Sequence, residues 1–252
     1  MAWWQFETLS RYEGLVHGVT SRHGGRSEAP YDSLNVGLHV GDDASLVVEN
    51  RRLVCDALGF GFEHLTFGQQ VHGARVHVMT SMEAGRGRAR FEDGLPGADG
   101  LIVREPGLAV GVYVADCVPL VMYDPERRVA AVVHAGWRGT AAGIAGEAVR
   151  VLTETLGVHP ETLHVGVGPA IGRCCYDVSA EVARAVGVAE LRDGKWYADL
   201  AEANYQQLMA AGVASNHIEL SGVCTACRAD EFYSERKLGR PTGRFAAIIA
   251  LR

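Results

Sequence analysis

The 252-residue sequence lacks the features that would direct a protein to a nucleic acid or a membrane. No basic run is longer than two residues, the formal net charge is −6, and the pI is near 5.9, so no positive surface is expected. No apolar run approaches the ~18 residues of a membrane span, and the first residues, MAWWQFETLSRYEG, lack the basic and apolar regions of a secretory signal. We therefore expect a cytoplasmic protein that acts on small molecules, without nucleic-acid or membrane partners.

Internal repeats, low-complexity tracts and Pro/Ser-rich linkers are also lacking. The composition, 48% hydrophobic and 21% charged residues, is that of an ordinary globular protein. These properties predict one domain over residues 1–252. The oligomeric state is open, with a monomer as the expectation. The six cysteines, without an export signal, are expected to be reduced thiols rather than a disulfide framework.

Three segments carry the signals of amphipathic helices. The first segment has Asp43 as its capping residue and ends at Gly59. The second has Thr140 as its capping residue. The third has Asp199 as its capping residue and ends at Gly212. The expected buried positions are Val47, Val54 and Leu58, then Ile144, Ala148, Val151 and Leu152, then Leu200, Ala203 and Leu208.

Strand signals lie between these helices. The predicted strands are Leu15 to Thr20, Ala74 to Met79, Leu108 to Val114, Leu120 to Tyr123, Val129 to Val133, Leu163 to Val167 and Phe245 to Leu251. The order of helices and strands is an α+β pattern rather than a regular βαβ alternation. The weakest stretch, residues 83–100, is rich in glycine and charge and is expected to be an exposed loop.

A predicted hairpin brings together two residues that bind metals. The turn Asp124-Pro125-Glu126-Arg127 joins two of the strands as an antiparallel pair. Cys117 immediately precedes the first strand and His134 immediately follows the second, so both return to the same end of the sheet. His72, before a glycine at the entry to another strand, is a third candidate. One Cys and two His from separated segments match a catalytic zinc site, in which the fourth position is kept for water.

Two cysteine pairs, Cys174-Cys175 and Cys224-Thr225-Ala226-Cys227, are further candidates for a structural zinc site or a redox pair. Adjacent cysteines are expected to point in divergent directions and lack the usual two-residue gap. We therefore interpret them as buried thiols near the site.

The stretch VVHAGWRGT, residues 132–140, has two glycines that allow a tight turn from strand to helix. The helix start after Thr140, together with Arg138, is a candidate seat for a phosphate or carboxylate. Arg22 and Asn35, around an earlier glycine turn, are candidates for binding polar substrate atoms. Each of these residues has a plain alternative role in stabilising its loop.

Many motifs follow one another in the order of a known family. They are SRHGG, PYDSLNVGLHVGDD, QQVHG, ADCVPLVMYDP, VHAGWRGTAAGI, GPAIGRCCYDV, SGVCTAC and TGRFAAIIAL, spread from residue 20 to 251. In this pattern the chain resembles the YfiH-like family, long labelled laccase-domain or polyphenol oxidase and described as purine nucleoside phosphorylases with accessory adenosine deaminase activity. Two segments depart from the family pattern: Glu235 replaces the usual aromatic or His, and Ala98-Asp99-Gly100 varies the usual Ala-Asp-Ala. If Glu235 lines the pocket, substrate preference is expected to differ.

The resemblance implies a single-domain layered α/β fold like that of the cytotoxic necrotizing factor catalytic domain. It implies a zinc ion held by His72, Cys117 and His134, the three residues already brought together by the hairpin. It further implies phosphorolysis of adenosine, inosine or methylthioadenosine. For this reaction we assign His72, Cys117, His134 and Arg138 as catalytic residues. Arg22, Asn35 and Gln70 are the expected substrate-binding residues.

Two other activities remain open. Some relatives are described as peptidoglycan editing factors, and Cys117 with His134 would suit an amide hydrolase of that kind. A copper-dependent polyphenol oxidase is disfavoured, since none of the ten histidines forms the His-x-His pairs of a multicopper cluster. One copper ion at the triad is still possible, because the affinity order favours copper over zinc.

Overall fold

Two six-stranded sheets form the centre of the molecule. The computed structural model describes residues 3–252. The first sheet has the order β1 (Trp3–Trp4), β2 (Leu15–Thr20), β15 (Phe245–Leu251), β7 (Ala109–Val114), β3 (Leu65–Gln69) and β5 (Leu95–Pro96). The second has the order β14 (Ile218–Leu220), β10 (His164–Val167), β8 (Val118–Asp124), β9 (Val129–Ala135), β6 (Gly100–Val103) and β4 (Val76–Val78).

The sheets pack against each other, and each buries both of its faces. Along β9, Ala130 and Val132 point into the core between the sheets, while Ala131 and Val133 point into a second core on the other face. This alternation follows from the period of two along a strand. Strands buried on both faces read as unbroken apolar runs, which explains the composition of VAAVVHA and FAAIIAL.

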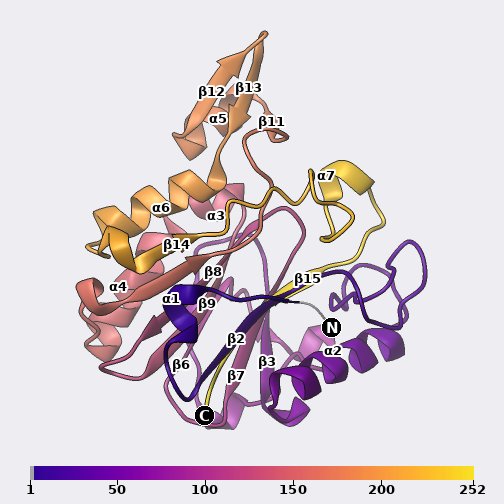
Figure 1. Cartoon of the computed structure of the whole chain (residues 1–252), viewed down its shortest axis with the longest axis vertical. Coiled ribbons are helices and arrows are strands. Elements are labelled where there is room, and N and C mark those ends of the chain that lie inside the picture. The colour runs from indigo at the N-terminus through magenta and orange to yellow at the C-terminus, as the bar shows by residue number, and fades with distance from the viewer. Residues whose placement is uncertain (1–2) are drawn as a thin grey trace.

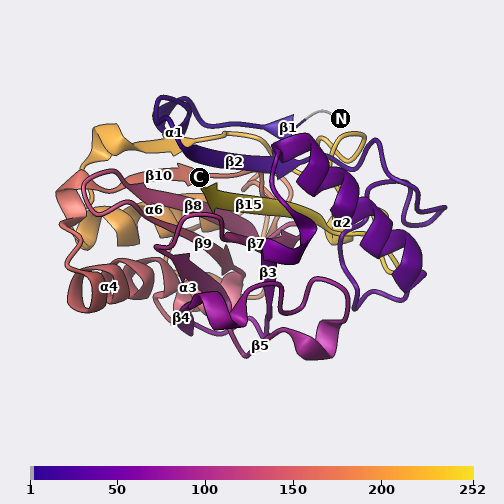
Figure 2. The ribbon, with the colours of Figure 1, turned by 90° about the horizontal axis from the view of Figure 1, so that it is seen from below.

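Helices cover the outer faces of the two sheets, so the layers run helix, sheet, sheet, helix. The first sheet is covered by α2 (Ala44–Leu58) and the second by α4 (Ile144–Leu156) and α6 (Leu200–Ala210). In both ribbon views α2 and α4 lie on opposite sides of the strands (Figures 1 and 2). Shorter helices are α1 (Glu7–Ser10), α3 (Trp137–Ala141) and α7 (Glu235–Leu238).

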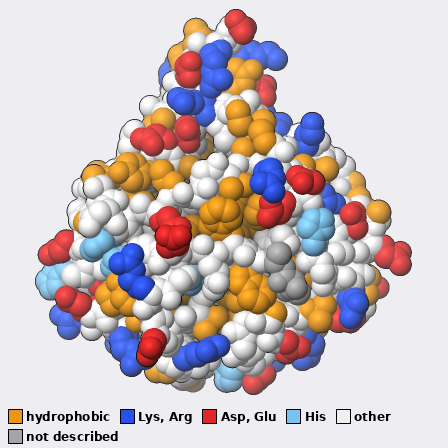
Figure 3. Space-filling model, viewed as in Figure 1, with side chains coloured by type: hydrophobic (Ala, Val, Ile, Leu, Met, Phe, Trp, Pro, Cys, Tyr) orange, Lys and Arg blue, Asp and Glu red, His pale blue; other side chains and the backbone are white. Residues whose placement is uncertain are grey.

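A small three-stranded sheet projects from this body. It contains β11 (Asp177–Val178), β12 (Ala189–Arg192) and β13 (Lys195–Ala198), with α5 (Ala180–Val186) beside it. It stands at the top of Figure 1, and acidic and basic side chains are mixed on its surface (Figure 3). Within residues 3–252, no helix has both the length and the apolar character needed to cross a membrane.

Most of the predicted elements are present. Asp43 caps α2 and Asp199 caps α6, each through a side-chain oxygen that accepts a backbone N–H. The prediction that Thr140 caps a helix is wrong, because Thr140 lies inside α3. The next helix, α4, starts after Gly143, whose positive φ of 80° interrupts the helical conformation between α3 and α4. The strands β3 and β6 and the projecting sheet were not predicted.

Candidate functional site

The register of the β8/β9 hairpin places two of the three candidate ligands. Val118 pairs with Ala135 and Pro119 with His134, so Cys117, just before β8, lies at the same sheet end as His134. The strand β9 extends two residues beyond its predicted end, to Ala135. His134 therefore lies within β9 rather than after it. One ligand atom from each of His72, Cys117 and His134 lies within 4.8 Å of the others. The structure thus brings together the triad that the sequence predicts.

A buried carboxylate, Asp99, holds the two histidines in place. Its Oδ1 accepts the backbone N–H of His72 at 2.9 Å, and its Oδ2 accepts that of Gly73 at 2.8 Å and that of Val71 at 3.2 Å. These bonds fix a turn in which His72 has a φ of 61°, a conformation that few non-glycine residues adopt. Oδ1 also lies 2.8 Å from Nδ1 of His134.

The contact between Asp99 and His134 selects the tautomer of the imidazole. With Nδ1 donating to the carboxylate, Nε2 remains free to bind a metal, which is the usual arrangement around metal-binding histidines. Asp99 is fully buried. Burial opposes its ionisation, yet the bonds from His134 and the backbone hold the pKa of this carboxyl below its ordinary value. Apart from the unusual Ala-Asp-Gly motif, no sequence pattern indicates this role of Asp99, because its contact with His134 spans 35 residues.

Gly136 leaves the space that the three ligand side chains occupy. A Cβ atom there would lie 2.9 Å from Cδ2 of His72 and 3.1 Å from Sγ of Cys117. Any other residue would therefore push these ligands apart. The glycine predicted to make a tight turn after β9 has this steric function.

Cys117 and His134 also form a proton-sharing pair. Burial raises the pKa of a thiol, but the His134 charge and its hydrogen bond outweigh it and lower the pKa of Cys117 to about 6. Burial lowers the pKa of His134, and the Cys117 charge and Asp99 outweigh it and raise that pKa to about 9. These two shifts favour a thiolate and an imidazolium in the metal-free pair, and both side chains become zinc donors once the imidazole has lost its proton.

A pocket of about 490 Å³ opens beside the triad, within the usual range for small-molecule sites. It is lined by His39, Val40, Gln70, His72, Tyr113, Val114, Ala115, Cys117, His134, Glu235, Arg240, Pro241, Thr242 and Arg244. The triad thus faces a cavity of the size that binds small molecules.

Of the predicted substrate residues, only Gln70 lines this pocket. Its side-chain amide donates to the carbonyl of Tyr113 and accepts its N–H, each at 2.9 Å. Arg22 instead bonds the carbonyls of Asp32 and Ala229. Asn35 is buried, and its Oδ1 accepts the N–H of Arg244 at 2.8 Å.

Arg138, the predicted catalytic cation, also lies outside the pocket lining. Its side chain is exposed and stacks on the ring of Trp137, with 4.2 Å between guanidinium and ring centre. Arg138 is the second residue of α3, a helix of only five residues whose start at Gly136 has no side-chain cap. The structure therefore does not bring Arg138 to the cavity that the triad faces.

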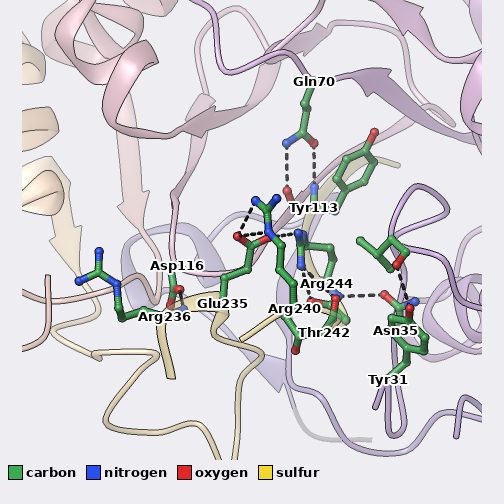
Figure 4. A network of polar contacts seen from close by, with 12 residues as sticks. Tyr31, Asn35, Gln70, Tyr113, Asp116, Glu235, Arg236, Arg240, Thr242 and Arg244 are labelled. Carbon is green, nitrogen blue, oxygen red and sulfur yellow. Dashed lines mark hydrogen bonds and ion pairs between the residues drawn. The ribbon is translucent and has the colours of Figure 1, made fainter. Parts of the chain in front are cut away.

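The cations of the pocket come from a loop that sequence reasoning missed. Arg240 and Arg244 both pair with Glu235, the former at 2.8 Å, and Figure 4 draws the three side chains together. Glu235, the residue that departs from the family pattern, does line the pocket. Within residues 3–252, the buried Oγ1 of Thr242, a residue of the pocket lining, has no hydrogen-bond partner.

His39 adds an aromatic wall. Its ring centre lies 4.8 Å from that of Tyr113 and 5.3 Å from that of Phe91. The side chain is exposed in the open pocket, yet desolvation by the surrounding chain, followed by the Arg244 and Arg51 cations, lowers its pKa to about 4. Both causes lower the pKa and outweigh the opposing charge of Glu235, so the neutral form of the ring is favoured at pH 7.

Comparison with known proteins places these features in a family. A sequence model described as "Multi-copper polyphenol oxidoreductase laccase" matches residues 16–252. The chain is 41% identical over 251 residues to "Purine nucleoside phosphorylase YlmD" of Geobacillus stearothermophilus, covering 96% of this chain and 92% of the relative. It is 34% identical over 242 residues to "Adenosine deaminase RL5" of an unknown prokaryotic organism, covering 92% of each.

Solved structures agree with this. The crystal structure of YlmD from Geobacillus stearothermophilus matches with a TM-score of 0.96 and 39% identity, covering 100% of this chain and 97% of that chain. A Bacillus licheniformis protein described as hypothetical protein YfiH matches with a TM-score of 0.93 and 35% identity, covering 96% and 94%. The expected α+β layered fold is confirmed.

Proposed function

This chain belongs to the family described as multi-copper polyphenol oxidoreductase laccase, and from that premise we propose that it is a metal-dependent purine nucleoside phosphorylase. In this reaction inorganic phosphate replaces the purine base on the ribose. Relatives named for purine nucleoside phosphorylase and adenosine deaminase support an enzyme of this type. Adenosine, inosine and methylthioadenosine are the proposed substrates, with deamination of adenosine as a second activity.

One observation carries the proposal. The same pocket is lined by the triad, by two arginines and by Thr242, whose buried hydroxyl has no hydrogen-bond partner among residues 3–252. A phosphorolytic site needs a place for an anion and a place for a nucleoside side by side. With one carboxylate, Glu235, between Arg240 and Arg244, the cluster keeps a net positive charge.

Arg240 and Arg244 are proposed to hold the phosphate. The Arg240 side chain is 80% exposed and can turn toward an anion, while that of Arg244 is 14% exposed and donates to the carbonyls of Thr242 and Gly243. Guanidinium groups suit this role because they bind phosphate oxygens in pairs. A phosphate oxygen then attacks the anomeric carbon, the bond to the purine nitrogen breaks, and the base leaves with that electron pair.

The purine is proposed to lie against His39. A neutral imidazole ring stacks on a base without adding charge, and either ring nitrogen offers a hydrogen bond. Tyr113 supports that wall from below: it is buried, and its hydroxyl donates to the carbonyl of Gly68 at 2.7 Å.

His72, Cys117 and His134 fit a zinc ion in donor type, number and convergence. Asp99 supplies the second hydrogen bond that zinc-binding histidines need. When bound there, zinc would act as a Lewis acid toward a substrate oxygen or a water, which is the chemistry that deamination requires. Copper is the alternative ion at the same donors.

The test is to incubate the protein with adenosine and phosphate and to separate adenine from inosine. We expect adenine only when phosphate is present, together with ribose 1-phosphate. Cys117→Ala should lose the metal bound at the triad and adenine formation, whereas Cys55→Ala, at a buried cysteine of α2 outside the site, should keep both. Adenine release without phosphate, or full activity in His72→Ala, would contradict the proposal.

A second candidate rests on the Cys117–His134 pair. A thiolate beside an imidazolium is the arrangement of a thiol hydrolase, so Cys117 would attack an amide carbonyl and His134 would protonate the leaving amine. Editing of a peptidoglycan precursor is a reaction of this class. It predicts rapid alkylation of Cys117 in chelator-treated protein and an acyl-enzyme visible by mass, neither of which the phosphorylase requires.

Multicopper oxidation is not proposed. Within residues 3–252 the groups of three or more converging metal-binding side chains are the triad and a cluster of four cysteines. A multicopper cluster needs several paired histidines, and these two groups contain only two histidines in all. The multicopper chemistry in the family's description is therefore not proposed for this chain.

A further inference from the structure

Four cysteines from two distant segments converge at one edge of the second sheet. Cys174 and Cys175 follow β10, and Cys224 and Cys227 follow β14. These strands pair in parallel, and a bridge between Ala170 and Cys224 continues the pairing into the loops. The four sulfur atoms all lie within 4.8 Å of one another. The expectation of buried thiols is wrong for Cys174 and Cys227, which are exposed.

The expected divergence of the adjacent pair is also wrong. The N–H groups of Cys175 and Tyr176 both donate to the carbonyl of Gly172, at 2.9 and 3.1 Å, which makes a tight turn. In this turn Sγ of Cys174 lies 3.6 Å from Sγ of Cys227, and Sγ of Cys175 lies 3.5 Å from the same atom. Both sulfurs therefore point to one centre.

These spacings match a tetrahedral zinc site. With Zn–S bonds of about 2.3 Å, the sulfurs of a regular tetrahedron lie about 3.8 Å apart. The observed separations are too long for disulfides, which need about 2.05 Å. The N–H of Gly172 donates to Sγ of Cys224 at 3.2 Å, a contact that stabilises a thiolate.

A bound metal ion would suit four sulfur atoms that converge this closely. Four thiolates this close would repel one another strongly, and only a bound positive charge would allow them all to ionise. Thiolate donors select zinc among the common divalent ions. The Cys-x-x-Cys spacing of Cys224 and Cys227 is the usual one for half of such a site.

We propose that Cys174, Cys175, Cys224 and Cys227 bind a zinc ion in a closed tetrathiolate site, separate from the triad. With four protein ligands it leaves no position for water or substrate, so its role is structural. It fastens the turn before the projecting sheet to the loop that leads into α7.

The loops that carry the four cysteines contact Asp116, the residue next to the triad ligand Cys117. Thr225, between the two loop cysteines, donates its hydroxyl to Asp116 at 2.7 Å, and Ile171 donates its N–H to the carbonyl of Asp116 at 2.8 Å. Arg236 donates its N–H to the other carboxylate oxygen at 2.8 Å, as Figure 4 shows. Asp116 has a φ of 80° and immediately precedes Cys117. The four-cysteine site therefore holds the backbone that presents Cys117.

Metal analysis of the purified chain tests this proposal. We expect two zinc ions per chain in the parent protein and an X-ray absorption spectrum dominated by sulfur. Cys117→Ser should retain one zinc, with four sulfur neighbours at about 2.3 Å. Cys174→Ser/Cys227→Ser should also retain one, now with mixed nitrogen and sulfur neighbours. Cys55→Ser is the matched control and should retain two.

Three results would overturn the proposal, the first two without any variant. The first is a parent chain in which no zinc ion has four sulfur neighbours after purification in zinc-containing medium. The second is an intact mass lowered by the hydrogens lost in disulfides among these cysteines. The third is a Cys174→Ser/Cys227→Ser protein that keeps two zinc ions. Because the readout is metal content and ligand type, loss of phosphorylase activity alone leaves this result unchanged.

Discussion

Replacing Asp99 with Asn tests how far one buried carboxylate organises the triad. Its two oxygens accept four bonds, three from the backbone of residues 71–73 and one from His134. An amide keeps one oxygen and turns an NH₂ group toward the donors at the other. Whichever way the amide points, two donors lose their acceptor.

The cost follows from that count. A buried donor without an acceptor costs about 1–3 kcal/mol, so the free energy of unfolding of metal-free Asp99→Asn should fall by about 2–6 kcal/mol. Zinc affinity should fall about 10–100-fold, as for other losses of a second hydrogen bond to a metal-binding histidine. Denaturant unfolding with chelator and competition with a chromophoric chelator measure the two quantities.

The control is Asp93→Asn, at an exposed carboxylate 3.8 Å from Arg90, which should change neither quantity appreciably. If Asp99→Asn keeps parental zinc affinity and stability, the carboxylate does not orient His72 and His134, and the account of the triad is refuted.

Three further predictions concern the same site. Gly136→Ala should abolish zinc binding at the triad while the chain still folds, since its Cβ would lie 2.9 Å from Cδ2 of His72 and 3.1 Å from Sγ of Cys117. Zinc titration measures the affinity and circular dichroism checks the fold. An unchanged zinc affinity would contradict this prediction. Zinc affinity should rise with pH because zinc displaces protons from its ligands. With a His134 pKa of about 9, the affinity should rise roughly tenfold per pH unit between pH 6 and 9. Below pH 6, the Cys117 pKa of about 6 should add a second factor of roughly ten per pH unit. A flat calorimetric profile over pH 5–9 would show that these groups are not ligands. Arg240→Ala should raise the KM for phosphate about tenfold or more with a smaller effect on that for adenosine, while Arg138→Ala, also an exposed arginine, should leave both near the parental values.

The metal triad could be predicted because its geometry follows from local rules. The turn Asp124-Pro125 sets the hairpin, and the hairpin register returns Cys117 and His134 to one end of the sheet. The position of His72 came from its residue type, from a glycine and from the family resemblance. No long-range contact had to be guessed for the first two ligands.

The rest of the site depends on contacts that no local pattern encodes. Arg240 and Arg244 lie in an irregular loop, and their place in the pocket depends on β15 and on the bond from Arg244 to Asn35. Arg138 was favoured by its closeness in sequence to His134, yet α3 turns its side chain onto Trp137. The convergence of the four cysteines likewise required the pairing of β10 with β14.

Metal reconstitution of the phosphorolytic reaction tests the central claim most directly. Chelator-treated protein is titrated with zinc at fixed adenosine and phosphate, and the rate of adenine formation is measured together with zinc bound at His72, Cys117 and His134. The account predicts that the rate rises from near zero in proportion to occupancy of the triad and stops rising when the triad is full. A metal-free protein that forms adenine at the full rate, or a refilled triad that forms none, would contradict it.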